Sequence, residues 1–206
     1  MALYLEAAES GTLELTPKTI TTSRSAIRVM SGAELADGRH FGSIRLSRLT
    51  WEDVEALYAA MRRSGRGPDW IRRCGTVLTR SLELARKRGL IDTNPSKDAV
   101  RPKSTRKKPY APLAEDVRKV LGFASERDPE VADMAMVLAS TGVRTGELLG
   151  LKWADVDLEA GEIHVSAAIT DGVPGVGVVL KPTKRSDWRD IPLTAAAAAA
   201  LRRQAE

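Results

Sequence analysis

Hydrophobic positions follow helical spacing through most of the first ninety residues and strand spacing near the end of the chain. The clearest helix is predicted over residues 49–65, where Thr50 and Asp53 have the spacing of a capping box. Apolar residues then recur at i, i+3, i+4 and i+7, which is the pattern of one buried helix face. They are Val54, Leu57, Tyr58 and Met61.

Two further helices are predicted on either side of it. Residues 16–38 offer a threonine cap, a proline at the first helical position and a closing turn that contains glycine. Residues 67–91 carry an apolar stripe and a second, basic face, and Gly89 is a natural stop. The stripe is Ile71, Leu78, Leu82 and Ala85, and the basic face is Arg73, Arg80 and Lys87.

The composition changes over residues 92–112, which are rich in proline, serine and cations. Such a segment is typical of an extended linker, and a domain boundary is predicted here. A basic linker is often merely solvated, so its cations do not by themselves indicate a ligand.

The second half is predicted to be mixed. Helices are expected over residues 113–124, 128–142 and 143–151, with one buried face on the second of these. That face comprises Val131, Met134, Ala135 and Leu138. Period-two stretches then predict three strands, over residues 161–169, 175–180 and 189–193, and Thr194 is the expected N-cap of a last helix. The expected fold class is mainly α with a small β-sheet.

Composition narrows the function classes. The formal net charge of +5 and the pI of about 9.5 permit nucleic acid, anionic lipid or acidic partners. Cys74 is the single cysteine, which excludes an internal disulfide and a cysteine-cluster metal site, and His40 and His164 have no partners at metal-ligand spacing. No apolar run approaches the roughly 20 residues of a membrane span, and the N-terminus lacks a signal peptide. A cytoplasmic protein without a metal is therefore expected.

The candidate chemistry lies in "TGVRTGELLGLKW", residues 141–153, where Arg144 and Glu147 are three residues apart at the end of an apolar helix. On spacing alone, such a pair is most often a surface salt bridge. A buried charge, in contrast, needs a partner or a task.

The surrounding stretch "LASTGVRTGELLGLKWADVDLEAGEIHV" resembles the first catalytic box of the tyrosine site-specific recombinases, the phage integrase family. "KPTKRSDWRDIPL" resembles their basic β-hairpin, and the helical first half resembles their core-binding domain. The resemblance implies a SAM-like helical core-binding domain (1–100), a basic linker (101–112) and the front part of a mixed α/β catalytic domain (113–206).

The resemblance also implies a reaction. In the family, a tyrosine attacks a DNA phosphodiester and forms a 3′-phosphotyrosine link that a partner strand later reverses, without metal, cofactor or small-molecule substrate. Arg144 matches the first catalytic arginine and Glu147 its acidic partner. Two residues compete for the hairpin lysine, which protonates the leaving oxygen: Lys184 is the better match and Lys181 the other.

The implied partners are double-stranded DNA and further recombinase protomers in a synaptic tetramer. The cations expected to contact DNA are Arg73, Arg80, Lys87, Arg101, Lys103, Arg106, Lys107, Lys108, Lys181 and Arg185. For each of these residues, the alternative is a solvated surface side chain that does not contact DNA.

The family active site also has an H-x-x-R box and a late tyrosine nucleophile, and neither pattern follows the hairpin here. Tyr4, Tyr58 and Tyr110 all precede Arg144. The expectation is a truncated recombinase of a mobile element that cleaves no DNA by itself. Two alternatives stay open: a non-catalytic DNA-binding module or regulator derived from an integrase, and a helical regulator unrelated to recombinases.

Overall fold

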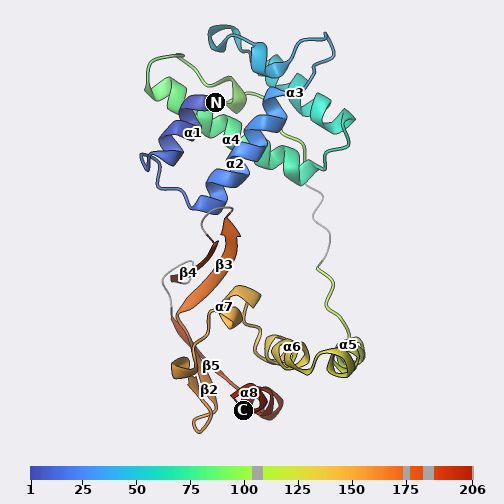
Figure 1. The fold of residues 1–206 in the computed structure, drawn as a ribbon. Helices are drawn as coiled ribbons and strands as arrows, with labels where there is room; N and C mark the ends of the chain where they lie inside the picture. The colour runs from blue at the N-terminus through green and yellow to red at the C-terminus, as the bar shows by residue number, and fades with distance from the viewer. Residues whose placement is uncertain (104–108, 174–176, 183–187, 206) are drawn as a thin grey trace. The chain divides into compact units, whose positions relative to one another are not determined.

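The computed structural model describes residues 1–103, 109–173, 177–182 and 188–205. It divides into two compact units, Met1–Lys108 (unit 1) and Pro109–Glu206 (unit 2). Unit 1 is helical and unit 2 adds small antiparallel sheets, so the predicted fold class, mainly α with a small sheet, is confirmed (Figure 1).

Unit 1 is built around α4, with α1 and α2 packed against it (Figure 1). Its helices are α1 (Ala2–Glu9), α2 (Pro17–Ser31), α3 (Trp51–Arg63) and α4 (Pro68–Lys87), with 3₁₀ turns η1 (Phe41–Ser43), η2 (Leu46–Arg48) and η3 (Pro95–Lys97). The predicted capping box at Thr50 is present, and both predicted apolar stripes are buried, all but Ala85 in one core. Hydrophobic period therefore identified the faces of α3 and α4 correctly.

Helix α1 is a helix of unit 1 that the pattern did not predict. It has no side-chain cap and a weak apolar stripe, because alanine and leucine lie on several of its faces. Tyr4, Ala7 and Ala8 are nevertheless buried. Contacts with α2 and α4 therefore stabilise a helix that has little local signal.

The predicted linker is partly a packed segment. From Asn94 to Pro102 the chain lies against α3 and α4, with Ser96 and Ala99 buried. Proline and lysine content had predicted an extended, solvated stretch here. The difference arises because short polar side chains bond to α4, a tertiary effect that composition does not reveal.

Unit 2 contains four helices, the turn η4 (Trp153–Asp155) and five strands among its described residues. The helices are α5 (Ala114–Arg127), α6 (Pro129–Thr141), α7 (Thr145–Leu149) and α8 (Ala195–Ala205). The strands are β1 (Val156–Asp157), β2 (Glu162–Val165), β3 (Ala167–Val173), β4 (Gly177–Pro182) and β5 (Arg189–Pro192). Thr194 caps α8 as predicted, since its Oγ1 accepts from the Ala197 N–H at 3.2 Å.

The strands form two antiparallel sheets, with orders β1-β2-β5 and β3-β4. In the first, Ile163 lies opposite Ile191; in the second, Ala168 lies opposite Lys181. The segment 181–193 resembles a basic hairpin in sequence, but β4 and β5 pair with β3 and β2 respectively. β4 and β5 thus belong to different sheets and do not pair with each other as a hairpin, because β5 pairs with β2, the central strand of the first sheet.

The face predicted to be buried on α6 is wrong. Val131 is 46% exposed, and Met134, Ala135 and Leu138 are only partly buried. The buried face instead carries Ala132, Asp133 and Val137. Nearly every position of this helix is apolar, so its period does not single out one face.

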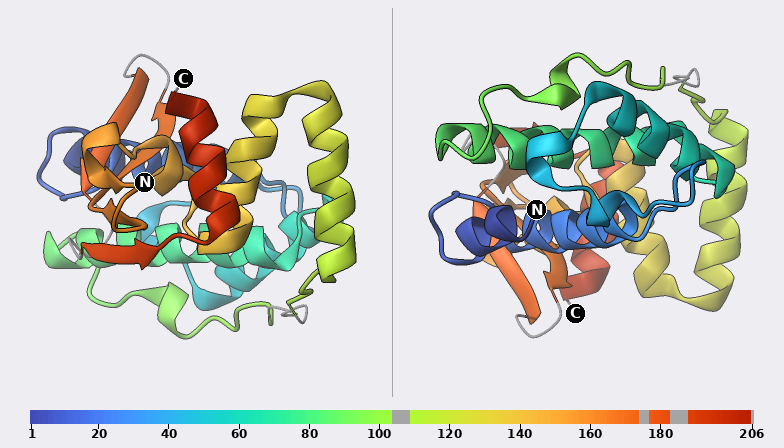
Figure 2. Two further views of the ribbon diagram at one scale, coloured as in Figure 1. Left: turned by 90° about the horizontal axis from the view of Figure 1, so that it is seen from below. Right: turned by 90° about the horizontal axis from the view of Figure 1, so that it is seen from above.

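Tertiary packing determines which face of α6 is buried, because α6 packs against both α5 and α8 (Figure 2, left). Asp133 accepts from the Arg203 guanidinium of α8, with Nε at 3.1 Å from Oδ2. The ion pair lowers the pKa of the Asp133 carboxyl. Val137 and Leu201 complete the core with Ile163 of β2.

Candidate functional site

A buried carboxylate in unit 2 holds two arginines. The Glu147 side chain is 4% exposed, and its Oε1 accepts from Arg144 Nη1 at 2.8 Å. Its Oε2 accepts from the Arg144 backbone N–H at 3.0 Å and from Arg189 Nη2 at 2.6 Å. Two guanidinium groups from distant parts of the chain therefore share one anion.

The three groups have unequal access to solvent. The Arg144 side chain is 80% exposed and that of Arg189 is 40% exposed, whereas their common partner is buried. Bonding from Arg189, then from Arg144, lowers the pKa of the Glu147 carboxyl to about 2, against the effect of burial. Two cations and one anion leave a net positive charge, and Arg144 presents its guanidinium outward.

Glycines set the position of this helix end. Gly142 ends α6 with φ +68°, a left-handed conformation that glycine adopts without strain. A Cβ on Gly146 would overlap the Ile169 carbonyl oxygen, and one on Gly150 would lie 3.0 Å from the Ile169 nitrogen. Helix α7 therefore packs directly on the backbone of β3, which places Glu147 in the interior.

Arg189 is the functional candidate that sequence reasoning missed. Strand β5 alternates, so Arg189 and Ile191 point toward the interior while Asp190 and Pro192 are exposed. A cation at an inward strand position signals a buried acidic partner. This signal was available in "WRDIPL", but it does not name Glu147, which lies 42 residues earlier.

Unit 1 presents a basic cavity of about 530 Å³ between α2 and α4. The predicted residues Arg73 and Arg80 line it, and Arg73 also lies over the Trp70 ring at 5.9 Å. Further cations and one carboxylate share the lining: Lys18, Arg72, Arg101 and Asp69. Such a surface favours an anion over a neutral ligand.

The other predicted cations are distributed more widely. Lys87 is exposed and lines an adjoining hollow with Arg80, and Lys103 is exposed. Lys181 is half-buried in β4, next to Leu180, which faces Gly150 of the α7 end. Five predicted residues lie outside the described part of the chain: Arg106, Lys107, Lys108, Lys184 and Arg185.

Known proteins resemble this chain in sequence and in fold. The model of the phage integrase family matches residues 111–206, which is almost all of unit 2. This part of the chain belongs to the phage integrase family, the tyrosine recombinases. The recombinase XerC of Yersinia pestis is 26% identical over 154 residues, which cover 74% of this chain and 50% of the relative.

Other tyrosine recombinases match a similar region. XerC of Shewanella amazonensis is 29% identical over 57% of this chain, and XerD of Halalkalibacterium halodurans is 30% identical over 59%. These matches cover 40% and 42% of the two relatives. The chain thus spans half or less of the length of these curated family members.

Solved integrases share the fold. The Tn1549 transposon integrase, in complex with a circular intermediate DNA, matches 98% of this chain and 63% of its own chain, with a TM-score of 0.78 and 21% identity. Lambda integrase, as a dimer bound to a COC′ core site, matches 89% of this chain and 62% of its own, with a TM-score of 0.64 and 19% identity. At these identities the likeness concerns the fold.

His164 and Cys74 are the remaining side chains of interest. His164 Nδ1 lies 2.7 Å from Asp190 Oδ1, and among the described residues no group of three or more potential metal ligands occurs. Cys74 is buried, and burial raises the pKa of its thiol to about 11. No helix in the described ranges is long and apolar enough to cross a bilayer.

Two of the three tyrosines are buried. Tyr4 and Tyr58 are each 3% exposed in the unit 1 core, whereas Tyr110 is 79% exposed just before α5. Exposed apolar side chains also occur on α5, among them Val120 and Phe123.

Proposed function

We propose that this chain is the DNA-binding and phosphate-activating part of a site-specific recombinase. The complete enzyme would bind duplex DNA and break and rejoin strands through a 3′-phosphotyrosine intermediate. The observation that carries the proposal is the buried Glu147 carboxylate, which orients the exposed guanidinium of Arg144.

Arg144 would act on the transition state of phosphoryl transfer. That state carries extra negative charge on its nonbridging oxygens, which a planar guanidinium matches with two hydrogen bonds. Orientation before the reaction is what makes such a charge effective. Glu147 fixes Arg144 through both its backbone and its side chain, and Arg189 holds the other side of the carboxylate.

Two groups would complete the described chemistry. A lysine between β4 and β5, Lys184 or Lys181, would protonate the leaving 5′-oxygen; Lys184 is favoured by its position eight residues before Pro192. The tyrosine nucleophile is not assigned to Tyr4 or Tyr58, since both are buried in a core. Tyr110 is exposed but precedes Arg144, whereas the family nucleophile comes late in the sequence. The 206 residues by themselves are therefore proposed to bind DNA without cleaving it.

DNA would lie against the basic cavity of unit 1. Arg73 and Arg80 are exposed there, and phosphate contacts by arginine need no particular base sequence. The Tn1549 and lambda integrases that share this fold were solved on DNA, and lambda integrase forms a tetramer on a Holliday junction. A recombinase tetramer is correspondingly the proposed assembly of the complete protein.

Covalent capture tests the chemistry. A suicide duplex carrying the native attachment site would be incubated with this chain and with a polypeptide extended through the downstream reading frame. We expect an adduct on a denaturing gel only with the extended polypeptide, and its loss with Arg144→Ala. Because Arg144 is mostly exposed, this variant should keep its fold, and it should keep most of its duplex binding through the other cations.

Two controls separate the assignments. Arg118→Ala removes an exposed arginine of α5 that is not assigned to the site, and should leave the adduct intact. An adduct from the 206-residue chain itself would contradict the proposed division of labour and point to Tyr110.

A further inference from the structure

The segment from Asn94 to Pro102, here called the strap, is fixed to unit 1 by polar bonds along its length. At its start, Asn94 Nδ2 donates to the Thr79 carbonyl at 3.0 Å. In its middle, the Val100 N–H donates to Glu55 Oε1 of α3 at 2.8 Å. At its end, Arg72 Nη1 donates to the Pro102 carbonyl at 3.1 Å.

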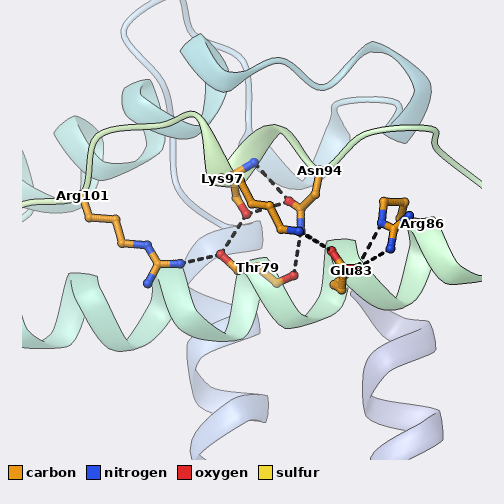
Figure 3. A network of polar contacts seen from close by, with 7 residues as sticks. Thr79, Glu83, Arg86, Asn94, Lys97 and Arg101 are labelled. Atoms are coloured by element: carbon orange, nitrogen blue, oxygen red, sulfur yellow. Dashed lines mark hydrogen bonds and ion pairs between the residues drawn. The ribbon is translucent and has the colours of Figure 1, made fainter.

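Thr79 is the centre of this network (Figure 3). Its Oγ1 accepts from Arg101 Nη2 at 2.6 Å and lies 2.8 Å from Ser96 Oγ and 2.9 Å from the Gly75 carbonyl. Ser96 Oγ in turn donates to Asn94 Oδ1 at 2.7 Å. One hydroxyl group therefore joins both halves of the strap to α4.

Beside the Thr79 network, a group of charged side chains also holds the strap to α4. Lys97 Nζ lies 3.1 Å from Glu83 Oε2, and Arg86 Nη2 lies 2.7 Å from Glu83 Oε1 (Figure 3). Bonding from Arg86 and then from Lys97 lowers the pKa of the Glu83 carboxyl to about 2. The carboxylate is thus charged at any physiological pH, and this contact does not depend on pH near neutrality.

The strap ends beside the basic cavity. Arg101 lines that cavity together with Arg72, and both arginines also hold the strap. Lys103, two residues later, is exposed, and Arg106, Lys107 and Lys108 follow in the sequence. The anchor therefore fixes the chain just before Lys103, where this run of cations begins in the sequence.

We infer that Thr79 is a positioning residue for DNA binding: it fixes Arg101 and the strap so that the basic run starts at the edge of the cavity. The inference rests on the proposed binding of duplex DNA. It assigns Arg101 to the anchor, whereas the sequence alone had assigned it to DNA. Physically, a tethered group acts at a high effective concentration only when its tether starts close to the target.

Anchoring is tested first without DNA, on the whole chain. Thr79→Val removes the hydroxyl at nearly constant shape, and Thr79→Ser keeps it. Thr21→Val is the matched control, because Thr21 Oγ1 bonds to the carbonyl four residues earlier and is not part of the strap network. Thermal unfolding followed by circular dichroism checks that each variant folds.

We expect Thr79→Val to raise hydrogen exchange at the Ser96 and Val100 amides at least about tenfold, because their local opening becomes easier. Trypsin should also cleave faster after Lys103. Thr79→Ser and Thr21→Val should resemble the native chain. Unchanged exchange in a folded Thr79→Val chain would overturn the anchor.

DNA binding is then measured by fluorescence anisotropy on a random-sequence 30-base-pair duplex at several salt concentrations. Thr79→Val should weaken binding about threefold to tenfold without changing the slope of log K against log salt, since no phosphate contact is removed. Arg101→Gln should add little to this loss in the Thr79→Val background, because the two residues act through one another.

The opposite pattern refutes the inference. If Arg101→Gln alone lowers the slope by about one and Thr79→Val leaves affinity unchanged, Arg101 contacts phosphate and the anchor does not position the basic run. If the native chain does not bind the duplex, the proposed function fails, whereas the exchange experiment still decides whether the anchor exists.

Discussion

Glu147 shows how much one residue contributes to the candidate site. Its carboxylate is buried and accepts hydrogen bonds from Arg144 and Arg189. Removing it would leave two guanidinium groups close together without their common anion. Because both arginines keep some contact with solvent, they can be hydrated, and the cost should be moderate for a broken ion pair.

Glu147→Gln should therefore destabilise unit 2 by about 2 kcal/mol at neutral pH. The native pKa is lowered, so this stabilisation is fully present above the ordinary carboxyl pKa of 4.5. It is lost as the pH falls from there through about 2. Urea unfolding of the native and Glu147→Gln chains at pH 7 and pH 3 measures this contribution. The difference in unfolding free energy between the two chains should be smaller at pH 3 than at pH 7.

A difference that stays constant between these pH values would show that the Glu147 charge is not the source of the stability. The Glu115→Gln variant is a suitable control, because its ion pair with Lys119 is on the surface of α5. Such an exposed pair contributes little, so this variant should change stability by under about 1 kcal/mol.

At the scale of elements, close contact with the β3–β4 sheet fixes the position of α7. Gly146 and Gly150 lie four residues apart, and both face the β3 backbone. Residues spaced by four share one face of a helix, so a missing Cβ at each allows the helix to approach the sheet closely. The same approach turns Glu147 toward Arg189 of β5.

Gly150→Ala tests this close approach. Its Cβ would lie 3.0 Å from the Ile169 nitrogen and 3.1 Å from Leu180 Cδ1, so α7 or the sheet must shift. We expect a loss of about 1–3 kcal/mol in unfolding free energy, together with less covalent adduct in the extended polypeptide. Gly122→Ala on α5 is the control, because its Cβ would meet open space.

Gly122→Ala should instead stabilise the chain by about 0.5–1 kcal/mol, as alanine replaces glycine inside a helix. Equal effects of the two substitutions in chemical unfolding would mean that helix propensity, and not packing on β3, governs Gly150.

At the scale of the whole molecule, positive charge occurs in both units and in the segment that joins them. Unit 1 contributes the cavity with Arg73 and Arg80, and unit 2 contributes Arg144. Each phosphate neutralised by such a cation releases counterions, so affinity for a duplex depends steeply on salt. The net charge of +5 alone predicts the sign of this effect but not its site.

Replacing Arg73 and Arg80 together by glutamine should weaken duplex binding about equally on unrelated sequences and lower the salt slope by about two. Anisotropy titrations on two unrelated duplexes at several salt concentrations measure both quantities. Arg118→Gln on α5 is the single-charge control and should leave the slope nearly unchanged. An unchanged slope in the Arg73 and Arg80 variant would place DNA elsewhere on the chain.

The sequence by itself determined the elements whose period and caps agree. The faces of α3 and α4, the caps at Thr50 and Thr194, and the pair of Arg144 with Glu147 were all predicted correctly. Each rests on interactions within a few residues of chain, and these leave a readable spacing.

Only the tertiary structure decided which distant residues meet. It gave Glu147 its second arginine from β5, buried a different face of α6, and turned part of the predicted linker into a strap centred on Thr79. In each case the partner lies far along the chain or several faces are equally apolar, so local spacing carries no preference. Burial and hydrogen-bond satisfaction across the folded unit then select the arrangement.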